Sequence, residues 1–393
     1  MTDRLYYTDC YLRDFTARVA ALAEDGRAVH LDRTAFYPTS GGQPFDLGTL
    51  AGIRVVGVED DDAGIVHRLA SPLDAGAADG VVDCAVDWSR RFDHMQQHTG
   101  QHLLSAVFEE RLGLKTVSFH MGAESSTIDL EGKLDAGAVA EVEARANQVV
   151  WENRPVAIGF EDARDAHGLR KASEREGALR VVSIEGLDRS ACGGTHVRST
   201  GEIGTVLLRK LEKVRQTVRV EFLCGGRAIR RARVDYEILA KASQALSGPF
   251  EEVPGLVTGL LESSRAEEKA RRKLELELAA YHGKELYQTS PVDADGVRRV
   301  VRRAETGNLE DLRAVAQNFT AQPKAVFLAA IANPPSVLLA VSDDAGMDAG
   351  KLLKAALTEA GGRGGGTSRM AQGSVPDRAA LDGVVGRVTG DGR

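Results

Sequence analysis

The sequence predicts an α+β multidomain protein, because its hydrophobic pattern changes from short strands to helices and then to a mixture of both. The chain has 393 residues, a length typical of two or three domains, and its apolar share of 43% is ample for a core in each. Its four cysteines are scattered without the spacing of a disulfide framework, which indicates a reducing compartment.

Residues 1–87 predict an N-terminal β-barrel or a similar all-β unit. Short apolar runs at 27–38, 52–64 and 81–88 are separated by glycine and aspartate, as expected for strands joined by turns.

Residues 88–224 predict sheets with covering helices. Helical periodicity covers 91–113 and 134–154, whereas 115–122, 126–132, 180–186 and 205–225 have the character of strands.

Residues 225–289 predict a helical hairpin that serves as a spacer. Two charged helical stretches, 227–246 and 255–286, are separated by glycine and prolines at 247–254, which interrupt a helix. An intramolecular hairpin is the simplest interpretation, and a homodimer through the C-terminal region, formed along the apolar stripe of these helices, is an alternative.

Residues 290–393 predict a small α/β domain. Strands at 297–301, 325–331 and 336–342 alternate with helices at 309–319 and 348–360. The glycine-rich stretch 361–366 is expected to be a loop whose backbone N–H groups could bind phosphate. No Lys-Ser/Thr pair follows these glycines, which excludes a nucleotide-hydrolysing P-loop.

Two pairs of metal-binding side chains predict one zinc site. His98 and His102 lie one helical turn apart on the same face, and Cys192 and His196 lie in a segment that contains two glycines. Each pair alone is a weak signal, but a thiolate together with imidazoles favours zinc over magnesium or calcium. His94 lies one turn before His98, and we expect it nearer solvent because Leu103 and Leu104 anchor the later end of the helix in the core.

Five segments carry a resemblance to a known family. HTGQHLLSAVF from His98, RSACGGTHVRSTGEIGTV from Arg189, FYPTSGGQPFDLGTL from Phe36 and FHMGAESSTIDL from Phe119 resemble the editing domain of alanyl-tRNA synthetases and the free-standing AlaX editing proteins. GGRGGGTSRMAQGSV from Gly361 is similar to the signature of the C-terminal DHHA1 domain. The resemblance implies a zinc-binding editing core at 88–224 and a DHHA1-like domain at 290–393.

The resemblance implies hydrolysis of the ester that joins serine or glycine, attached in error, to alanine tRNA. Zinc could activate a water or polarise the ester carbonyl. Four protein ligands would fill a tetrahedral shell, whereas catalytic zinc usually keeps one position open. Either one ligand is loose, or the metal positions the substrate while water attacks from beside it.

Three polar residues are candidates for catalytic or specificity roles. Gln43 and Gln101 carry amides that could position water or the sugar. The resemblance associates a hydroxyl residue near the glycine motif with recognition of the serine side chain. Thr39 and Ser40 are the candidates, and we favour Thr39. A site that binds a hydroxyl rejects alanine because its polar group would be left unpaired.

The charge balance permits tRNA binding without proving it. The net charge is −7, but basic residues cluster at 209–219, 227–233 and 298–303. The N-terminus lacks a signal peptide and no apolar run is long enough to cross a membrane, so we expect a cytoplasmic protein without membrane contact.

Three further expectations concern activity. The β-rich segment begins at the N-terminus without room for an aminoacylation module, so no ligase activity is expected. A zinc-stabilised tRNA-binding module without hydrolysis is one alternative. A DHHA1-linked phosphoesterase is another, although such enzymes need aspartate-rich motifs for two manganese ions and the chain offers only Asp93 and His94.

Overall fold

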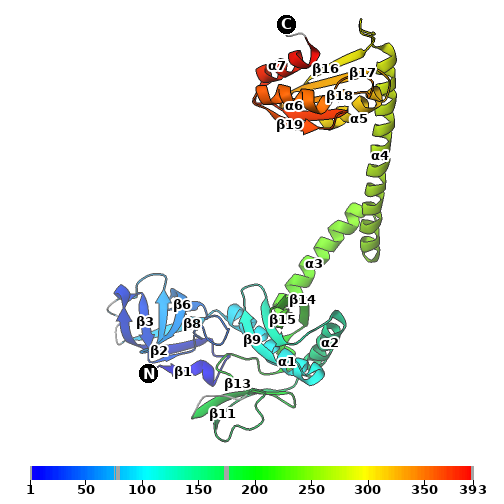
Figure 1. Ribbon diagram of the computed structural model, residues 1–393. Helices are drawn as coiled ribbons and strands as arrows, with labels where there is room; N and C mark the ends of the chain where they lie inside the picture. The colour runs from blue at the N-terminus through cyan, green and yellow to red at the C-terminus, as the bar shows by residue number, and fades with distance from the viewer. Residues whose placement is uncertain (1, 75, 77–79, 172–176, 391–393) are drawn as a thin grey trace. The chain divides into compact units, whose positions relative to one another are not determined.

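The computed structural model describes residues 2–74, 76, 80–171 and 177–390 and divides the chain into two compact units, Met1–Ala242 and Ser243–Arg393 (Figure 1). The expectation of a mixed α/β multidomain protein is confirmed, because the described residues form several sheets and seven α-helices. No helix in the described part of the chain combines the length and the apolarity needed to span a bilayer.

The first unit begins with a closed six-stranded barrel. Its strands follow one another around the barrel in the order β2 (Asp14–Ala23), β3 (Ala28–Leu31), β7 (Gly64–Leu69), β6 (Ile53–Asp61), β5 (Gly48–Leu50) and β8 (Val81–Val86). Apolar side chains that alternate along these strands fill the interior, among them Val29, Leu31 and Leu50. Outside the barrel, the short strands β1 (Asp3–Arg4) and β4 (Arg33–Thr34) pair in parallel.

After the barrel, the first unit contains two antiparallel sheets, two helices that pack with them, and most of α3 (Gly225–Leu246) (Figure 1). One sheet has the order β14 (Val206–Val214), β15 (Thr217–Cys224), β10 (Ser126–Glu131) and β9 (Thr116–Met121). The other has the order β11 (Val156–Asp162), β12 (Ala178–Ile184) and β13 (Asp188–Ala191). Helices α1 (Trp88–Leu112) and α2 (Ala136–Glu152) pack with these strands around one apolar core.

Helix α1 is the central element of this core. Asp87 caps its first turn by accepting a hydrogen bond from Arg90 N, and Gly113 ends it in the left-handed conformation. Every residue from Gln97 to Phe108 is buried, because α2, β9, β13 and β15 all pack on the helix. The expectation that His94 lies nearer solvent is wrong: it is 2% exposed, since the surrounding elements also cover the first half of the helix.

The second unit contains a five-stranded mixed sheet. Its order is β16 (Arg298–Thr306), β17 (Ala325–Asn333), β18 (Ser336–Val341), β20 (Met370–Ser374) and β19 (Arg363–Gly366). One apolar cluster joins the sheet to α6 (Ala349–Glu359) and α7 (Arg378–Thr389). Another joins it to α5 (Leu309–Thr320) and to the end of α4 (Val253–Thr289).

The glycine-rich stretch expected to be a loop is a strand. Residues Arg363–Gly366 form β19, which pairs antiparallel with β20, so the backbone there follows the sheet and does not form a phosphate-binding loop. A Cβ atom on Gly364 would lie 2.4 Å from the carbonyl oxygen of Gln372, so the glycine is required by close packing.

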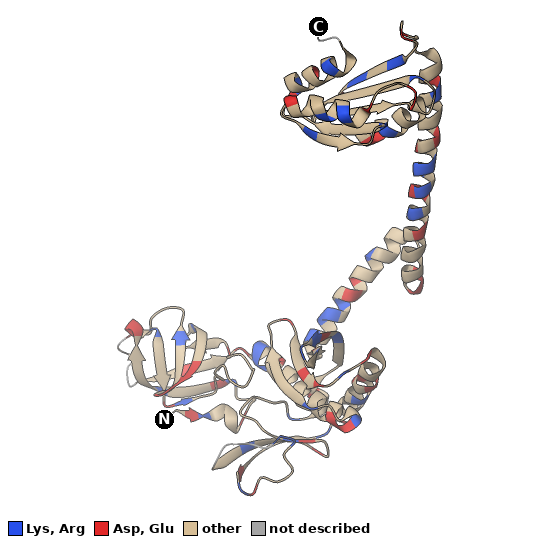
Figure 2. Cartoon of the chain, in the orientation of Figure 1, with Lys and Arg blue, Asp and Glu red and all other residues tan. Residues whose placement is uncertain are grey.

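The helical hairpin stays a prediction. Helix α3 (Gly225–Leu246) belongs mostly to the first unit and α4 to the second, and each is described within its own unit. Within the second unit α4 packs against α5, and basic and acidic side chains are mixed along its length (Figure 2).

A buried ion pair joins the barrel to α1. Arg91 and Asp46 both have fully buried side chains, and Nε of Arg91 donates to Oδ2 of Asp46 over 3.0 Å. The same guanidinium donates to the carbonyl oxygens of Cys10, at 2.9 Å, and Ala35. Asp46 also accepts from the backbone N of Tyr37 at 2.7 Å, so the pair ties several segments together.

Replacing Asp46→Asn or Arg91→Met is expected to lower the free energy of unfolding of the first unit by about 3–5 kcal/mol, because each change leaves the other partner buried without its counter-charge. Urea unfolding followed by tryptophan emission measures this, since the two tryptophans, Trp88 and Trp151, both lie in the first unit.

The matched control is Arg68→Met, which breaks the more exposed contacts of Arg68 with Glu24 and Glu59 in the same barrel. It should cost less than about 1 kcal/mol. Equal losses for the buried and the exposed pair would show that the Arg91 pair does not hold α1 in place.

Candidate metal centre

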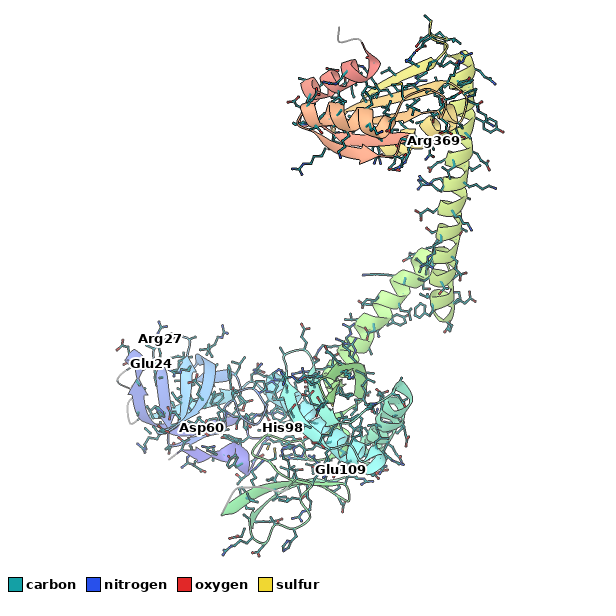
Figure 3. All side chains as sticks on the ribbon, viewed as in Figure 1. Glu24, Arg27, Asp60, His98, Glu109 and Arg369 are labelled. Atoms are coloured by element: carbon teal, nitrogen blue, oxygen red, sulfur yellow. The ribbon has the colours of Figure 1, made fainter. Side chains whose placement is uncertain are left out.

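The structure brings His98, His102, Cys192 and His196 together. One donor atom from each lies within 4.8 Å of all the others. Sγ of Cys192 is 3.5 Å from Nε2 of His98 and 3.3 Å from Nε2 of His196. His98, labelled in Figure 3, and His102 come from α1, where both are buried, and the other two come from the segment after β13.

Each histidine ring of the cluster is held through its second nitrogen. Nδ1 of His98 is 2.8 Å from Oε1 of Gln43, and Nδ1 of His102 is 2.9 Å from Oδ2 of Asp188. Nδ1 of His196 is 3.1 Å from Oγ1 of Thr99. These contacts favour the tautomers with a proton on Nδ1, which leave each Nε2 lone pair directed at the centre of the cluster.

Asp188 is itself firmly held. Arg170 donates to its Oδ1 over 2.7 Å, and Oγ of Ser190 lies 3.1 Å from the same oxygen. A carboxylate that binds a histidine in this way fixes the ring's tautomer and orientation.

The glycines after Cys192 make room for the histidine rings. A Cβ atom on Gly194 would lie 2.1 Å from Cε1 of His98, so only glycine fits. The backbone N of Gly194 also donates to Sγ of Cys192 over 3.4 Å, which stabilises a thiolate.

The electrostatics of the cluster favour a metal-binding thiolate. Burial raises the pKa of Cys192, but the His98 and His196 rings beside it outweigh burial and hold the pKa well below its usual range. Burial lowers the pKa of His196 to about 3. Burial also opposes the proton on His102, yet the hydrogen bond to Asp188 raises that pKa to about 9. A bound cation would compete with this proton and release it.

A cavity of about 910 Å³ opens beside the cluster. The connection between β4 and β5 contributes Tyr37, Ser40 and Gly41 to its lining, and α1 contributes His98 and Gln101. Arg180 comes from β12, and Cys192 comes from the segment after β13. The volume is in the range of small-molecule sites. The four side chains that could hold a metal therefore lie in or beside the wall of a space that could hold the end of a larger substrate.

The three other sequence-derived candidates have different surroundings. Gln43 is fully buried, and its Oε1 accepts hydrogen bonds from His98 and from the backbone N of Thr195. Gln101 lines the cavity, and its Nε2 donates to Oγ of Ser105 over 2.8 Å. Thr39 is exposed, does not line this cavity, and accepts from the backbone N of Phe45, whereas Ser40 does line it.

Sequence reasoning missed two of the residues that bind the Nδ1 atoms of the histidine rings, Thr99 and Asp188. Thr99 follows His98 directly, so its position beside a ligand was a usable signal. Asp188 lies four residues before Cys192, but a lone carboxylate in a polar segment gives no sign of its partner.

The basic clusters noted in the sequence are partly paired with carboxylates. Arg219 binds Asp129 at 2.7 Å, and Arg227 binds Asp93 at 2.7 Å. In the second unit Arg299 binds Asp293 at 2.7 Å. Much of the positive charge at these positions is therefore neutralised within the protein.

Comparison with known proteins gives a consistent result. Residues 179–221 match the family model of the threonyl and alanyl tRNA synthetase second additional domain. The alanine–tRNA ligase of Pyrococcus furiosus is 32% identical over 406 residues, which include 99% of this chain but only 43% of the ligase. The chain therefore spans less than half the length of this relative.

Two shorter relatives are covered almost completely. The alanyl-tRNA editing protein AlaX-M of Methanosarcina acetivorans is 39% identical over 232 residues, or 54% of this chain and 94% of the relative. The alanyl-tRNA editing protein AlaX-L of Pyrococcus horikoshii is 32% identical over 393 residues, or 95% of each chain. Because the match to AlaX-L extends over nearly the whole length of this chain and of that relative, the chain belongs to the AlaX family of alanyl-tRNA editing proteins.

Proposed function

We propose that the protein is a trans-editing hydrolase that removes serine or glycine from wrongly charged alanine tRNA at a single zinc ion. AlaX editing proteins are aminoacyl-tRNA deacylases, a class of carboxylic ester hydrolase, and family membership supports the same activity here. The observation that carries the zinc site is the convergence of three imidazoles and one thiolate in the wall of a substrate-sized cavity.

The residues fit zinc in chemistry and in spacing. One thiolate with three imidazoles is a donor set typical of zinc. In a tetrahedral shell with bonds of about 2.1 Å to nitrogen and about 2.3 Å to sulfur, a nitrogen and the sulfur lie about 3.6 Å apart. The two sulfur–nitrogen distances around Cys192, 3.5 and 3.3 Å, are close to this value.

The chain's own residues would position the ester and exclude bulk water. A bound zinc ion would polarise the ester carbonyl or lower the pKa of a bound water. Gln43 fixes His98 and the backbone at Thr195, so the cluster keeps its geometry when substrate binds. Gln101 lines the cavity and offers an amide to the water or to the sugar. We propose that Ser40, which lines the cavity, contacts the amino-acid side chain.

A zinc-stabilised tRNA-binding module without hydrolysis is the second candidate. Asp188, Gln43 and Thr99 hold all three histidine rings, which would also suit a closed structural shell. The cavity beside the ligands favours hydrolysis, because a purely structural site has no need of substrate-sized space.

The tRNA is proposed as the partner of both units. We assign the second unit to the DHHA1 type on the resemblance of its glycine-rich segment, and we propose that it contacts the tRNA body. The phosphoesterase alternative is weakened because Arg227 binds Asp93 at 2.7 Å, which commits that carboxylate to an ion pair. The preferred amino acid and the oligomeric state, a homodimer included, stay predictions.

Cys192→Ala is expected to abolish release of labelled serine from seryl-tRNA of the alanine type, because it removes the thiolate ligand. The loss should reach about 100-fold or more, together with loss of bound zinc by metal analysis. Cys84→Ala is the control, since Cys84 is a buried cysteine that lies in the barrel, and its serine release should be unchanged. A zinc-free variant at position 192 that still deacylates the tRNA would refute the zinc-dependent mechanism.

Removal of metal by a chelator is expected to stop hydrolysis while the first unit stays folded, because its apolar core is built independently of the four ligands. Tryptophan emission and serine release, measured on the same sample, separate the two effects. Readdition of zinc should restore activity. Unfolding in parallel with the loss of metal would instead favour the structural-zinc candidate.

Ser40→Ala is expected to slow deacylation of seryl-tRNA by about tenfold and to leave glycyl-tRNA unaffected, because it deletes a hydrogen-bonding group for the serine hydroxyl. Thr39→Ala is the comparison. Its hydroxyl already accepts from Phe45 N and lies outside the cavity lining, so a smaller effect is expected. A serine-specific loss only in the Thr39 variant would restore the choice made from sequence.

A further inference from the structure

The cavity beside the metal ligands has a positively charged wall. Its described lining residues include four cationic side chains but only one carboxylate, Asp60; the cations are Arg4, Arg170, Lys171 and Arg180. Asp60 lies on the barrel (Figure 3) and already binds Arg4 at 2.8 Å. Arg170 binds Asp188 at 2.7 Å, so the cations of this wall that form no ion pair with a described carboxylate are Lys171 and Arg180. Their charge favours an anionic ligand at this place, although the net charge of the whole chain is −7.

Arg180 is the most buried of these cations. It is only 7% exposed, yet the described part of the chain places no carboxylate in an ion pair with it. Its Nε donates to the carbonyl oxygen of Tyr7 over 2.9 Å, and its Nη1 donates to that of Cys192 over 2.6 Å. Its Nη2 lies 3.7 Å from Sγ of Cys10.

These contacts hold the guanidinium in one orientation but do not use it fully. A guanidinium has five N–H donors, and each of the three contacts uses one, so two remain for a ligand. Two adjacent N–H groups match the oxygens of a phosphate. Burying this charge without a carboxylate is costly unless an anion completes the site.

An exposed aromatic residue lies beside Arg180. Phe160 on β11 is the cross-strand partner of Arg180 on β12, and directly opposed residues point to the same face of a sheet. Both residues line the cavity, and Phe160 is 53% exposed. A phosphate-binding guanidinium next to an exposed ring is the combination that recognises a nucleotide, with the base stacked on the ring.

We propose that Arg180 and Phe160 form a subsite for the terminal nucleotide of the tRNA, with Arg180 binding its 5′-phosphodiester and Phe160 contacting its base. Lys171 adds positive charge at the same wall. The subsite rests on the proposed function, because it is the place next to the reacting ester that a nucleotide would occupy.

The position of Arg180 supports this assignment. Its guanidinium is bonded to the backbone of Cys192, which is a metal ligand, so the two sites are adjacent. In an aminoacyl-tRNA the ester is on the terminal ribose and the phosphodiester is on the other side of the same sugar. An ester at the metal ligands therefore places that phosphate one sugar away, where the guanidinium lies.

The test compares two small substrates on the full-length zinc protein. One is 3′-O-seryl-adenosine with a charged 5′-methyl phosphodiester, and the other carries a neutral methylphosphonate of the same shape. The wild-type kcat/KM should be about 10- to 100-fold higher for the charged substrate, mostly through KM.

Arg180→Met should bring this ratio close to one. Because the ratio compares two substrates on the same variant, any loss of activity that affects both cancels. If Arg180→Met proves too unstable to assay, Lys171→Met provides the test, since it changes an exposed side chain and should lower the ratio by about threefold or more. The control for both is Arg164→Met, which lies outside the cavity and binds Asp162.

Phe160→Ala should raise KM for both substrates by about tenfold while leaving the ratio unchanged, because it removes base stacking but not the charge. Trp151→Ala is its control, as Trp151 is 80% exposed on α2 and lies outside the cavity lining. A raised KM in both variants would overturn the role of Phe160.

The outcomes separate the subsite from the function. Hydrolysis of both substrates at equal rates by the wild-type protein overturns the subsite and leaves the deacylase intact. If no aminoacyl ester is hydrolysed, full-length seryl-tRNA included, the proposed function fails. In that case the binding of the unacylated charged and neutral nucleotides is measured, and a lack of preference for the charged one overturns the subsite as well.

Discussion

The position of α1 depends on a charge pair that has no access to water. Arg91 lies near the start of the helix and has a fully buried guanidinium, and Asp46 binds it from the segment just before β5 of the barrel. A buried ion pair of this kind adds little net stability to a fold. Its geometry is nevertheless strictly constrained, because a buried charge without its partner destabilises the protein strongly. Since the same guanidinium also binds the carbonyls of Cys10 and Ala35, its hydrogen bonds hold the barrel and the helix in one arrangement.

That arrangement sets the metal centre. Once α1 is fixed against the barrel, Gln43 from the barrel reaches the ring of His98 and the backbone of Thr195 with one amide. The segment after β13 then completes the cluster, and Gly194 allows it to approach the helix closely. The four ligands are thus oriented by residues from three separate segments, which suits a site that must keep its geometry while a bulky substrate enters.

Sequence patterns predicted the four side chains that converge in the cluster and most of the helices, because both depend on local spacing. One helical turn separates His98 from His102, and the Cys192 segment has its own glycine signal. They did not predict the burial of His94, because that depends on how many elements pack around α1. They also misplaced 363–366, since a run of glycines is typical of a loop until a neighbouring strand and a close-packed helix require small residues. They did not predict the role of Asp188, because its partner His102 is distant in sequence.

Recognition of a polyanion by an acidic chain is understandable if positive charge is local. Arg219, Arg227 and Arg299 form ion pairs with nearby carboxylates, which neutralise their charge. Around the cavity Arg4 and Arg170 are paired with Asp60 and Asp188, but Lys171 and Arg180 form no ion pair with a carboxylate of the described residues. Attraction there acts over a short range, because salt screens charges beyond about 8–10 Å. Such a site would recognise the terminal nucleotide once it is next to the cluster, but it would not attract tRNA from a distance. The first binding of the tRNA would then depend on surfaces outside the cavity.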